Sequence, residues 1–316
     1  MINFLVSVII PVYNAELFIK KAILSALNQQ EVEEVIVVND GSTDESLEII
    51  EALQKEHDRI KIYHHINKIN KGRSASRNLG IKMATKDYIA FLDADDFYLE
   101  GRFLNDKILF KTNPLIEGVY NAIGVHFYRE KTKEELLNLS LTTVTEKIKY
   151  DNLFYTILSG KKGYFSIDGL TVKKTILKKT GYFVENLQIA EDTDLTLKMS
   201  LICRLEAGVI DRPLAVRGVH DNNIFNNEDL YLRDRHKMFE SLIHWSLNKN
   251  QPLKVVDELL KWLFYYRLKE KHSNFKETFY WLYLLKKNPK LISTNLALKY
   301  FPIIRKRKSI FPFLFK

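Results

Sequence analysis

Residues 6–12 read VSVIIPV, an almost continuous apolar run of the kind found in a central strand buried on both faces of a parallel sheet. A short polar turn at Tyr13 and Asn14 follows this run. Apolar residues then recur three and four positions apart between Ile19 and Leu27, which predicts a helix that lays one stripe on the sheet. Together these segments predict a β-α unit.

The same alternation continues through the first hundred residues. Helical spacing covers about 75–83, and Ser42-x-x-Glu45 has the form of a capping box, which predicts the start of another helix. Apolar runs predict further strands at 35–38, 60–63 and 88–92. This alternation indicates an α/β fold with a doubly wound, mainly parallel sheet of the Rossmann-like, nucleotide-binding kind, whose ligands bind beyond the carboxyl ends of the strands.

The chain has 316 residues, of which 46% are hydrophobic, so it can bury a full core. We expect one domain over 1–222, with a nucleotide-binding half at 1–100 and a second half at 101–222. Beyond it, the spacing of apolar and aromatic residues predicts a mainly helical C-terminal region over 223–316.

The composition also bears on the cellular compartment. Cys203 is the only cysteine, so the chain forms no internal disulfide, and a reducing compartment is expected. The start of the sequence lacks the pattern of a signal peptide, and no run of 18 apolar residues occurs. These features predict a cytoplasmic protein.

Polar clusters stand where the predicted strands end, at 11–14, 39–44, 70–78 and 93–96. In the last cluster Asp93, Asp95 and Asp96 place three carboxylates within four residues, and their mutual repulsion is relieved most simply by a divalent cation. Hard oxygen ligands suit Mn²⁺ or Mg²⁺. A solvated acidic turn without a metal is the alternative.

Five motifs occur in a recognisable order: SVIIPVYN, VNDGSTD, NKGRSASRNLG, FLDADD and AED. Over roughly the first 220 residues the chain therefore resembles glycosyltransferase family 2. The resemblance implies a GT-A fold and a metal-dependent enzyme that transfers a hexose or N-acetylhexosamine from a nucleotide-diphosphate donor to an acceptor hydroxyl with inversion.

The resemblance also assigns donor-binding roles. Pro11 and Tyr13 would line the base pocket, and Asp40 would accept a hydrogen bond from a uracil ring nitrogen, so the donor is expected to be a UDP-sugar. Arg77 would face the phosphates or the ribose, and Asp93 would lie near the ribose. The alternatives are that Tyr13 only packs, that Asp40 caps a turn, and that Arg77 pairs with a carboxylate.

Two residues are expected to bind the metal. Asp95 matches the second carboxylate of the family's Asp-x-Asp motif, and His220 matches a histidine that completes the metal or diphosphate site. The match at His220 is imperfect, because Val216 replaces the usual aromatic residue and Asn222 or Asn223 stands where a serine is frequent. The role of His220 therefore stays open at this point.

The resemblance places the catalytic base at Asp192, the second member of the Glu191-Asp192 pair. This carboxylate would remove the proton of the acceptor hydroxyl during a single displacement at the anomeric carbon. The alternative is that Glu191 and Asp192 only stabilise the start of a helix, since carboxylates interact favourably with a helix N-terminus.

Other functions fit the sequence less well. Dinucleotide oxidoreductases and P-loop enzymes are disfavoured, because the chain contains no G-x-G and no G-K-[ST]. A sugar nucleotidyltransferase would carry a Gly-rich loop where PVYNAE stands, and a non-catalytic nucleotide-sugar or glycan-binding protein is the remaining alternative. The chain lacks the Q-x-x-R-W element of processive relatives, so we expect addition of single sugars to a glycan or lipid-linked acceptor, in surface polysaccharide or glycolipid synthesis.

The formal charge of +9 is concentrated at the end of the chain, where no acidic residue follows Glu277. Residues 299–316 read KYFPIIRKRKSIFPFLFK and combine basic with aromatic residues. Such a segment favours an anionic membrane surface, here the cytoplasmic face of the inner membrane. The alternatives are a tail packed on the catalytic domain and a nucleic-acid contact, which is disfavoured because no nucleic-acid motif accompanies it.

Overall fold

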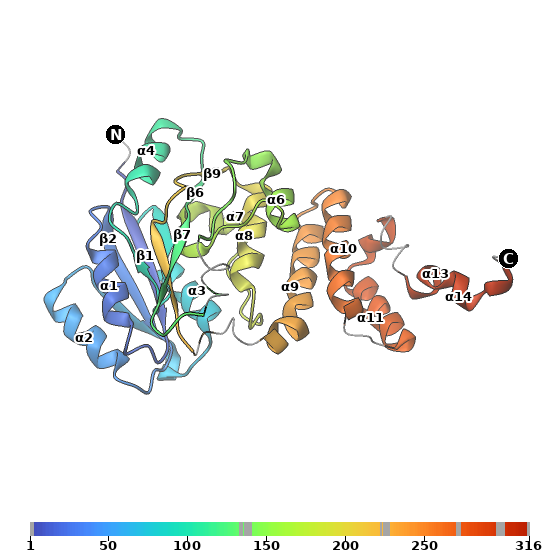
Figure 1. Cartoon of the computed structure of the whole chain (residues 1–316), viewed down its shortest axis with the longest axis horizontal. Helices are drawn as coiled ribbons and strands as arrows, with labels where there is room; N and C mark the ends of the chain where they lie inside the picture. Colours follow the sequence, from blue (N-terminus) through green and yellow to red (C-terminus); the bar gives the residue numbers. More distant parts are fainter. Residues whose placement is uncertain are drawn as a thin grey trace. The chain divides into compact units, whose positions relative to one another are not determined.

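The computed structural model describes residues 3–132, 135, 141–221, 223, 228–269, 273–294 and 301–314. Two compact units are present: Met1–Glu185 with Glu191–Asn226, and Asn186–Ala190 with Asn227–Lys316. Each unit is described by itself below (Figure 1).

A mixed sheet forms the centre of the first unit. It contains β1 (Val6–Val12), β2 (Val32–Asn39), β3 (Ile60–His64), β4 (Tyr88–Phe91), β6 (Gly118–Tyr120), β8 (Leu170–Lys173) and β9 (Leu205–Ala207). The strands run in the order β3-β2-β1-β4-β8-β6-β9, and only β8 is antiparallel to its neighbours. The predicted α/β fold with a mainly parallel sheet is therefore confirmed.

The run VSVIIPV forms β1, and all of its residues are buried. Because side chains alternate along a strand, Val8 and Ile10 belong to one hydrophobic core and Ile9 to the core on the other face. Gly80 of α3 lies so close to β1 that a Cβ atom there would collide with Ile9. Only glycine, which has no side chain, therefore allows α3 to pack this closely against β1.

Helices cover both faces of the sheet (Figure 1). Residues of α1, α2 and α4 contribute to the core that contains Val8, and residues of α3, α6 and α8 to the core that contains Ile9. These helices are α1 (Ile19–Leu27), α2 (Ser46–Glu56), α3 (Arg73–Met83), α4 (Leu104–Thr112), α6 (Tyr150–Ser159) and α8 (Glu191–Ile202). Shorter segments are η1 (Ile66–Lys68), η2 (Ile167–Gly169), η3 (Lys174–Ile176) and α7 (Leu177–Thr180).

The predicted capping box is wrong, because α2 begins only at Ser46 and its N-cap has no side-chain hydrogen bond. Ser42 instead accepts a hydrogen bond from the backbone N–H of Asn14, at 3.1 Å. The N–H of Glu45 donates to the side chain of Glu16 at 2.9 Å. These side chains and amides connect the loop after β2 to the loop after β1.

A second, smaller sheet consists of β5 (Phe97–Tyr98), β10 (Ala215–Val219) and β7 (Ile123–Phe127), with β10 in the middle. Gly218 of β10 approaches the loop after β4 so closely that a Cβ atom would collide with the carbonyl oxygen of Asp95. Its N–H donates to Asp96 Oδ1 at 2.8 Å. The smaller sheet thus brings the chain near residue 220 beside the acidic motif.

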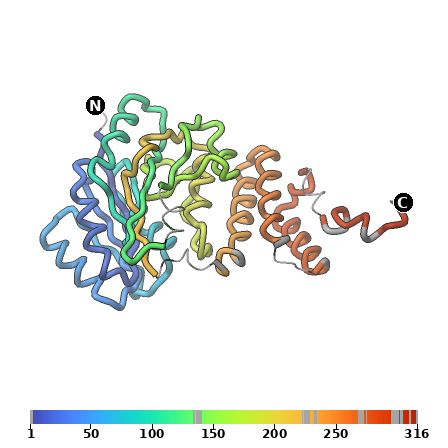
Figure 2. Tube along the Cα trace, viewed as in Figure 1, coloured from blue at the N-terminus to red at the C-terminus, as the bar shows by residue number. Residues whose placement is uncertain are grey.

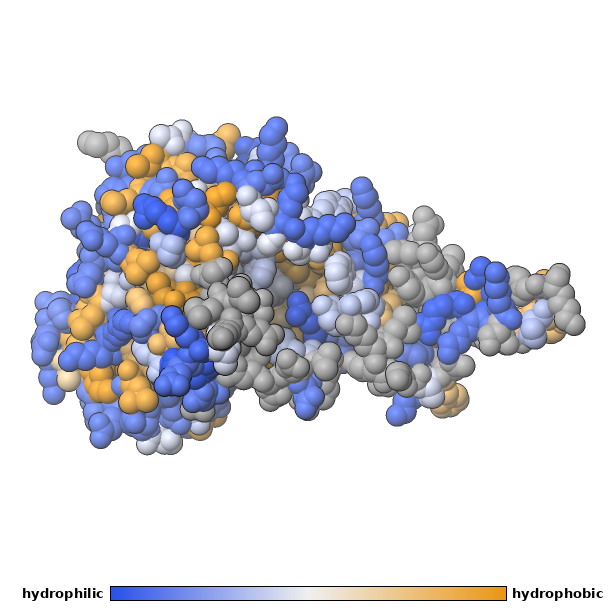
Figure 3. Space-filling view, in the orientation of Figure 1, coloured by the Kyte–Doolittle hydropathy of each residue, from blue (hydrophilic) through white to orange (hydrophobic). Residues whose placement is uncertain are grey.

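The second unit is helical, as predicted for the C-terminal region (Figure 2). Its elements are α9 (Glu228–Asn248), α10 (Leu253–Lys269), α11 (Asn274–Lys287), η5 (Pro289–Ser293), α13 (Pro302–Arg305), α14 (Arg307–Ile310) and η6 (Pro312–Leu314). Leu242, Leu260 and Trp281 are buried in it. Both hydrophilic and hydrophobic residues reach the face of this unit drawn in Figure 3. Within the described residues, no helix is long and apolar enough to cross a membrane.

Candidate active site

The polar clusters predicted from the sequence lie at one edge of the main sheet, because β1, β2 and β4 are mutually parallel and end there. Pro11 is buried within β1, and the side chain of Tyr13, just beyond the strand, is 52% exposed. The Asn14 side chain accepts a hydrogen bond from the Thr43 N–H at 2.8 Å. The loops after β1 and β2 therefore form one continuous rim.

Asp40 is buried at this rim, directly after β2. Its two carboxylate oxygens accept hydrogen bonds from the backbone N–H groups of Lys71, at 2.7 Å, and Gly72, at 2.8 Å. Burial lowers the pKa of His65, whose Nε2 lies 3.4 Å from Asp40 Oδ1. Asp40 thus orders the loop before α3. Each carboxylate oxygen still has a second lone pair with which it can accept a ligand hydrogen bond.

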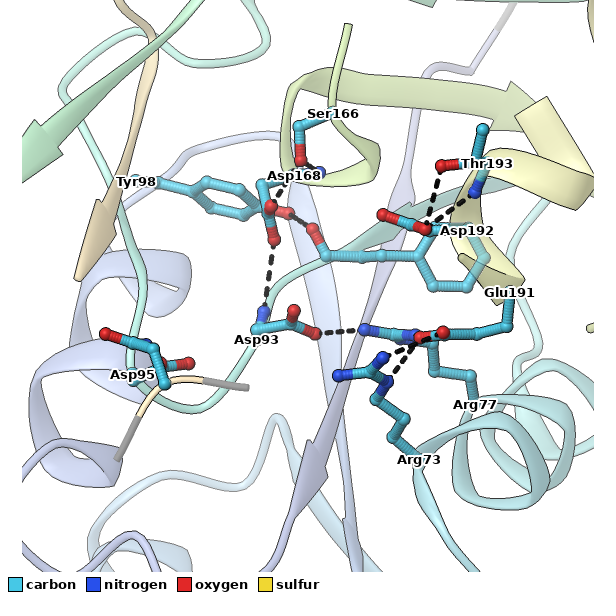
Figure 4. A network of polar contacts seen from close by, with 12 residues as sticks. Arg73, Arg77, Asp93, Asp95, Tyr98, Ser166, Asp168, Glu191, Asp192 and Thr193 are labelled. Carbon is cyan, nitrogen blue, oxygen red and sulfur yellow. Dashed lines mark hydrogen bonds and ion pairs between the residues drawn. The ribbon is translucent and has the colours of Figure 1, made fainter. Parts of the chain in front are cut away.

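Arg77 of α3, which the resemblance places near the phosphates or the ribose, has an enclosed side chain, and the residue is 1% exposed. One guanidinium nitrogen lies 2.5 Å from Asp93 Oδ1 and another 2.9 Å from Glu191 Oε1 (Figure 4). Burial alone would lower the pKa of Arg77, but Asp93 and Glu191 outweigh it and raise this pKa. The guanidinium therefore stays charged and links α3, the end of β4 and the start of α8.

Arg73 lies one helical turn before Arg77 and also pairs with Glu191. Its side chain is about one-third exposed, in contrast to that of Arg77. The site residues expected from the sequence did not include Arg73, although its spacing of four residues from Arg77 placed both on the same face of a helix. Both oxygens of Glu191 are occupied by these two arginines.

Asp95 and His220 lie together although 125 residues separate them in the chain. His220 Nε2 is 3.0 Å from Asp95 Oδ2, and the Asn223 side-chain amide donates to the same oxygen at 3.0 Å. The His220 ring stacks on Phe18, with 4.7 Å between ring centroids. Asn222, named beside Asn223 in the sequence analysis, lies outside the described residues. The two predicted metal ligands therefore share one position at the rim.

Asp168 of η2 completes an acidic cluster that the sequence did not indicate. Ligand oxygens of Asp93, Asp96 and Asp168 all lie within 4.8 Å of one another. Burial, followed by the negative charge of Asp93, raises the pKa of Asp168 to about 6. Burial and the neighbouring carboxylates, of which Asp168 contributes most, also raise the pKa of Asp96 well above its usual range. Both shifts arise first from burial and then from the repulsion between neighbouring carboxylates.

A buried ion pair and its hydrogen bonds position the backbone of Asp168. Arg102 donates to the backbone carbonyl oxygen of Asp168 at 3.2 Å and pairs with Asp106 at 2.9 Å. Asp106 also accepts hydrogen bonds from Asn121, at 2.9 Å, and Thr171, at 2.6 Å. A buried ion pair with these additional hydrogen bonds is fully satisfied, so it can fix the backbone of η2.

Asp192 is the second residue of α8 and is half-buried. Its Oδ1 accepts hydrogen bonds from the Thr193 backbone N–H at 2.6 Å and from the Thr193 hydroxyl at 3.2 Å. Figure 4 shows the other carboxylate oxygen turned away from Thr193. Ala190, just before the helix, has a φ of 57°, a left-handed conformation that is strained for alanine and frequent near functional sites.

The chain is similar to known proteins. Residues 7–157 match the family described as glycosyl transferase family 2. An uncharacterized glycosyltransferase of Haemophilus influenzae is 36% identical over 176 residues, which cover 55% of this chain and 64% of the relative. The minor teichoic acid biosynthesis protein GgaB of Bacillus subtilis is 34% identical over 61% of this chain and 21% of its own length. The chain thus spans less than two thirds of these relatives.

Solved structures show the same fold. Staphylococcus aureus TarS 1-349 in complex with UDP-GlcNAc has a TM-score of 0.66 at 18% identity, covering 96% of this chain and 92% of TarS 1-349. The mannosyltransferase PcManGT of Pyrobaculum calidifontis, in complex with GDP-Man and Mn²⁺, has a TM-score of 0.52 at 15% identity. The match covers 97% of this chain and 87% of PcManGT. The mostly parallel sheet with flanking helices is that of GT-A glycosyltransferases. Residues 7–157 thus match glycosyl transferase family 2, and the similarity to relatives named as glycosyltransferases extends over a longer part of the chain.

Proposed function

We propose that this protein transfers a single hexose or N-acetylhexosamine from a UDP-sugar to an acceptor hydroxyl, with inversion, in the synthesis of a surface polysaccharide or glycolipid. The convergence of Asp93, Asp95 and Asp192 around one sheet edge carries the proposal. Support comes from TarS, solved with UDP and with UDP-GlcNAc, and from relatives named for teichoic acid and hyaluronan synthesis.

The side chains at the rim fit a divalent cation. Asp95 and His220 would hold Mn²⁺ or Mg²⁺, since their ligand atoms already lie 3.0 Å apart, and Asp95 is next in the chain to Asp96 of the acidic cluster. Carboxylate oxygens with one imidazole nitrogen are ligands that these metals accept, Mn²⁺ more readily. When bound, the ion would neutralise the charge that develops on the departing nucleotide diphosphate.

The remaining residues divide between donor and acceptor. Pro11, Tyr13 and Asp40 would hold the uridine at the rim formed by the loops after β1 and β2. Asp192 would take the proton of the acceptor hydroxyl while that oxygen attacks the anomeric carbon from the face opposite the leaving diphosphate. Such a single displacement inverts the configuration and needs no covalent sugar–enzyme intermediate.

Isothermal titration of the protein with UDP tests the donor site. We expect binding to be stronger with Mn²⁺ than without it, and at least tenfold weaker in both Asp95→Ala and Asp40→Ala, because the first loses a metal ligand and the second the uracil contact. Asp58→Ala removes an exposed carboxylate elsewhere and should bind like the parent. Unchanged affinity in both site variants would contradict the proposed donor site.

We also propose that the C-terminal tail attaches the enzyme to an anionic membrane surface. In the described part of the tail, Ile304, Phe313 and Leu314 are exposed close to Arg305 and Arg307. Basic residues near an anionic surface contribute about 1 kcal/mol each. Flotation with phosphatidylglycerol vesicles should therefore show at least fivefold weaker binding after deletion of residues 299–316, and equal binding by the two proteins would refute this role.

A further inference from the structure

The inner face of α11 is fully used in the packing of the helical unit. Trp281 and Leu284 are buried, and the Trp281 ring lies edge-on to Phe264 with 5.6 Å between centroids. Glu277, on the same face, is buried and pairs with Arg267 at 3.2 Å. These contacts fix the orientation of α11, so its opposite face points outward.

That outer face is apolar. Phe275 is 72% exposed, Phe279 56%, Leu282 49% and Tyr283 44%. Their spacing of four, seven and eight residues from Phe275 places them on one side of the helix, and the Phe275 and Phe279 rings lie 4.5 Å apart. A helix that already buries one apolar stripe normally presents polar residues to water. Several neighbouring large apolar side chains on the surface instead indicate an interaction site.

The exposed charged residues of α11 and η5 are all basic, and the acidic Glu240 of α9 lies beside Tyr280 on the flank of α11. Lys276, Lys286, Lys287 and Lys290 are exposed on α11 and η5. From residue 273 to the end of the sequence Glu277 is the only acidic residue, and it is buried. A second copy docked through the same face would oppose these lysines to themselves, which disfavours a symmetric dimer. A partner with an apolar interior and an anionic surface would complement the apolar side chains and the lysines of this face.

We propose that the outer face of α11 docks on an anionic lipid membrane. Phe275, Phe279 and Leu282 enter the boundary between headgroups and acyl chains, Tyr283 lies at headgroup level, and the lysines contact the phosphates. The inference deepens the membrane part of the proposed function, since it assigns a folded helix, separate from the tail, as a contact surface. It does not depend on the transfer reaction.

Flotation of the full chain with phosphatidylglycerol vesicles, and with phosphatidylcholine vesicles as the neutral comparison, tests the surface. The double variant Phe275→Ala with Phe279→Ala should bind the anionic vesicles at least tenfold more weakly, because the inserted aromatic area is lost. Ile108→Ala with Leu115→Ala removes two exposed apolar side chains from the first unit and should bind like the parent.

The charge contribution has its own matched pair of variants. Lys276→Gln with Lys286→Gln should weaken binding to anionic vesicles severalfold and have little effect with neutral ones. Lys55→Gln with Lys111→Gln neutralises two exposed lysines of the first unit and should leave binding to both kinds of vesicle unchanged.

Insertion is measured directly with Phe279→Trp and vesicles whose acyl chains are brominated. We expect the added tryptophan to be quenched beyond the parent, in which the neighbouring Trp281 is buried. Loss of binding on tail deletion, with none on the α11 substitutions, would overturn the inference and leave the tail as the contact. No binding by the parent, or equal binding to RNA and vesicles, would also overturn it. The UDP titration reports on the transferase proposal independently.

Discussion

Substitution of Asp192 by asparagine is expected to lower the turnover number for sugar transfer by about 10²–10⁴-fold, the usual contribution of a general base. Asparagine keeps the size of the side chain and an oxygen that can accept the hydrogen bond from the Thr193 N–H. It cannot take a proton from the acceptor hydroxyl. The rate of UDP release from the UDP-sugar that the parent turns over, in the presence of acceptor, measures the effect.

The geometry favours Asp192 over its neighbour Glu191 as the base. Glu191 is buried and both of its oxygens are paired with Arg73 and Arg77, so a proton acceptor at that position would have to break ion pairs. UDP binding by Asp192→Asn should match the parent, which separates a catalytic defect from a damaged donor site. Asp151→Asn, at an exposed position, serves as the control. Turnover of Asp192→Asn within threefold of the parent would show that another group is the base.

Substitution of Arg77 by methionine is expected to lower the free energy of unfolding by about 3–5 kcal/mol, because it leaves carboxylates of a buried ion pair without their partner. Glu191 keeps only Arg73, and Asp93 loses its 2.5 Å contact. Urea unfolding followed by circular dichroism measures the effect. Tryptophan fluorescence is unsuitable, because Trp245, Trp262 and Trp281 all belong to the second unit.

A surface pair gives the matched control for Arg77. Lys162 pairs with Glu146, and both side chains are at least half-exposed, so Lys162→Met should cost no more than about 1 kcal/mol. Adding Glu191→Gln to Arg77→Met should recover part of the loss, because it removes a buried charge that has kept only one of its two arginine partners. If Arg77→Met destabilised the protein no more than Lys162→Met does, the ion pairs of Arg77 would not stabilise the fold.

Much of the fold could be predicted because its signals are local. The run at 6–12 is apolar except for Ser7, since β1 is buried on both faces. Short runs rich in apolar residues also marked the strands at 35–38, 60–63 and 88–92. The capping box failed for a non-local reason. Ser42 and Glu45 bind the loop after β1, with partners 28 and 29 residues away, and this competes with capping α2.

The candidate site divides in the same way. Asp93, Asp95 and Asp192 could be named from motifs, because each follows or begins an element that the sequence predicts. Asp168 could not, since nothing near it in the sequence distinguishes it from an ordinary turn residue. It enters the site only because η2 and β8 pack beside β4.

The sequence by itself determined the strand–helix alternation, the acidic motif after β4 and the resemblance to the family, because periodicity and motifs are properties of neighbouring residues. Tertiary structure decided which charges meet: Arg77 with Glu191, 114 residues apart, and Asp95 with His220, 125 residues apart. Coulomb energy depends on distance in space and on burial, and chain topology brings these groups together. For that reason only the folded chain shows that Arg77 pairs with both Asp93 and Glu191.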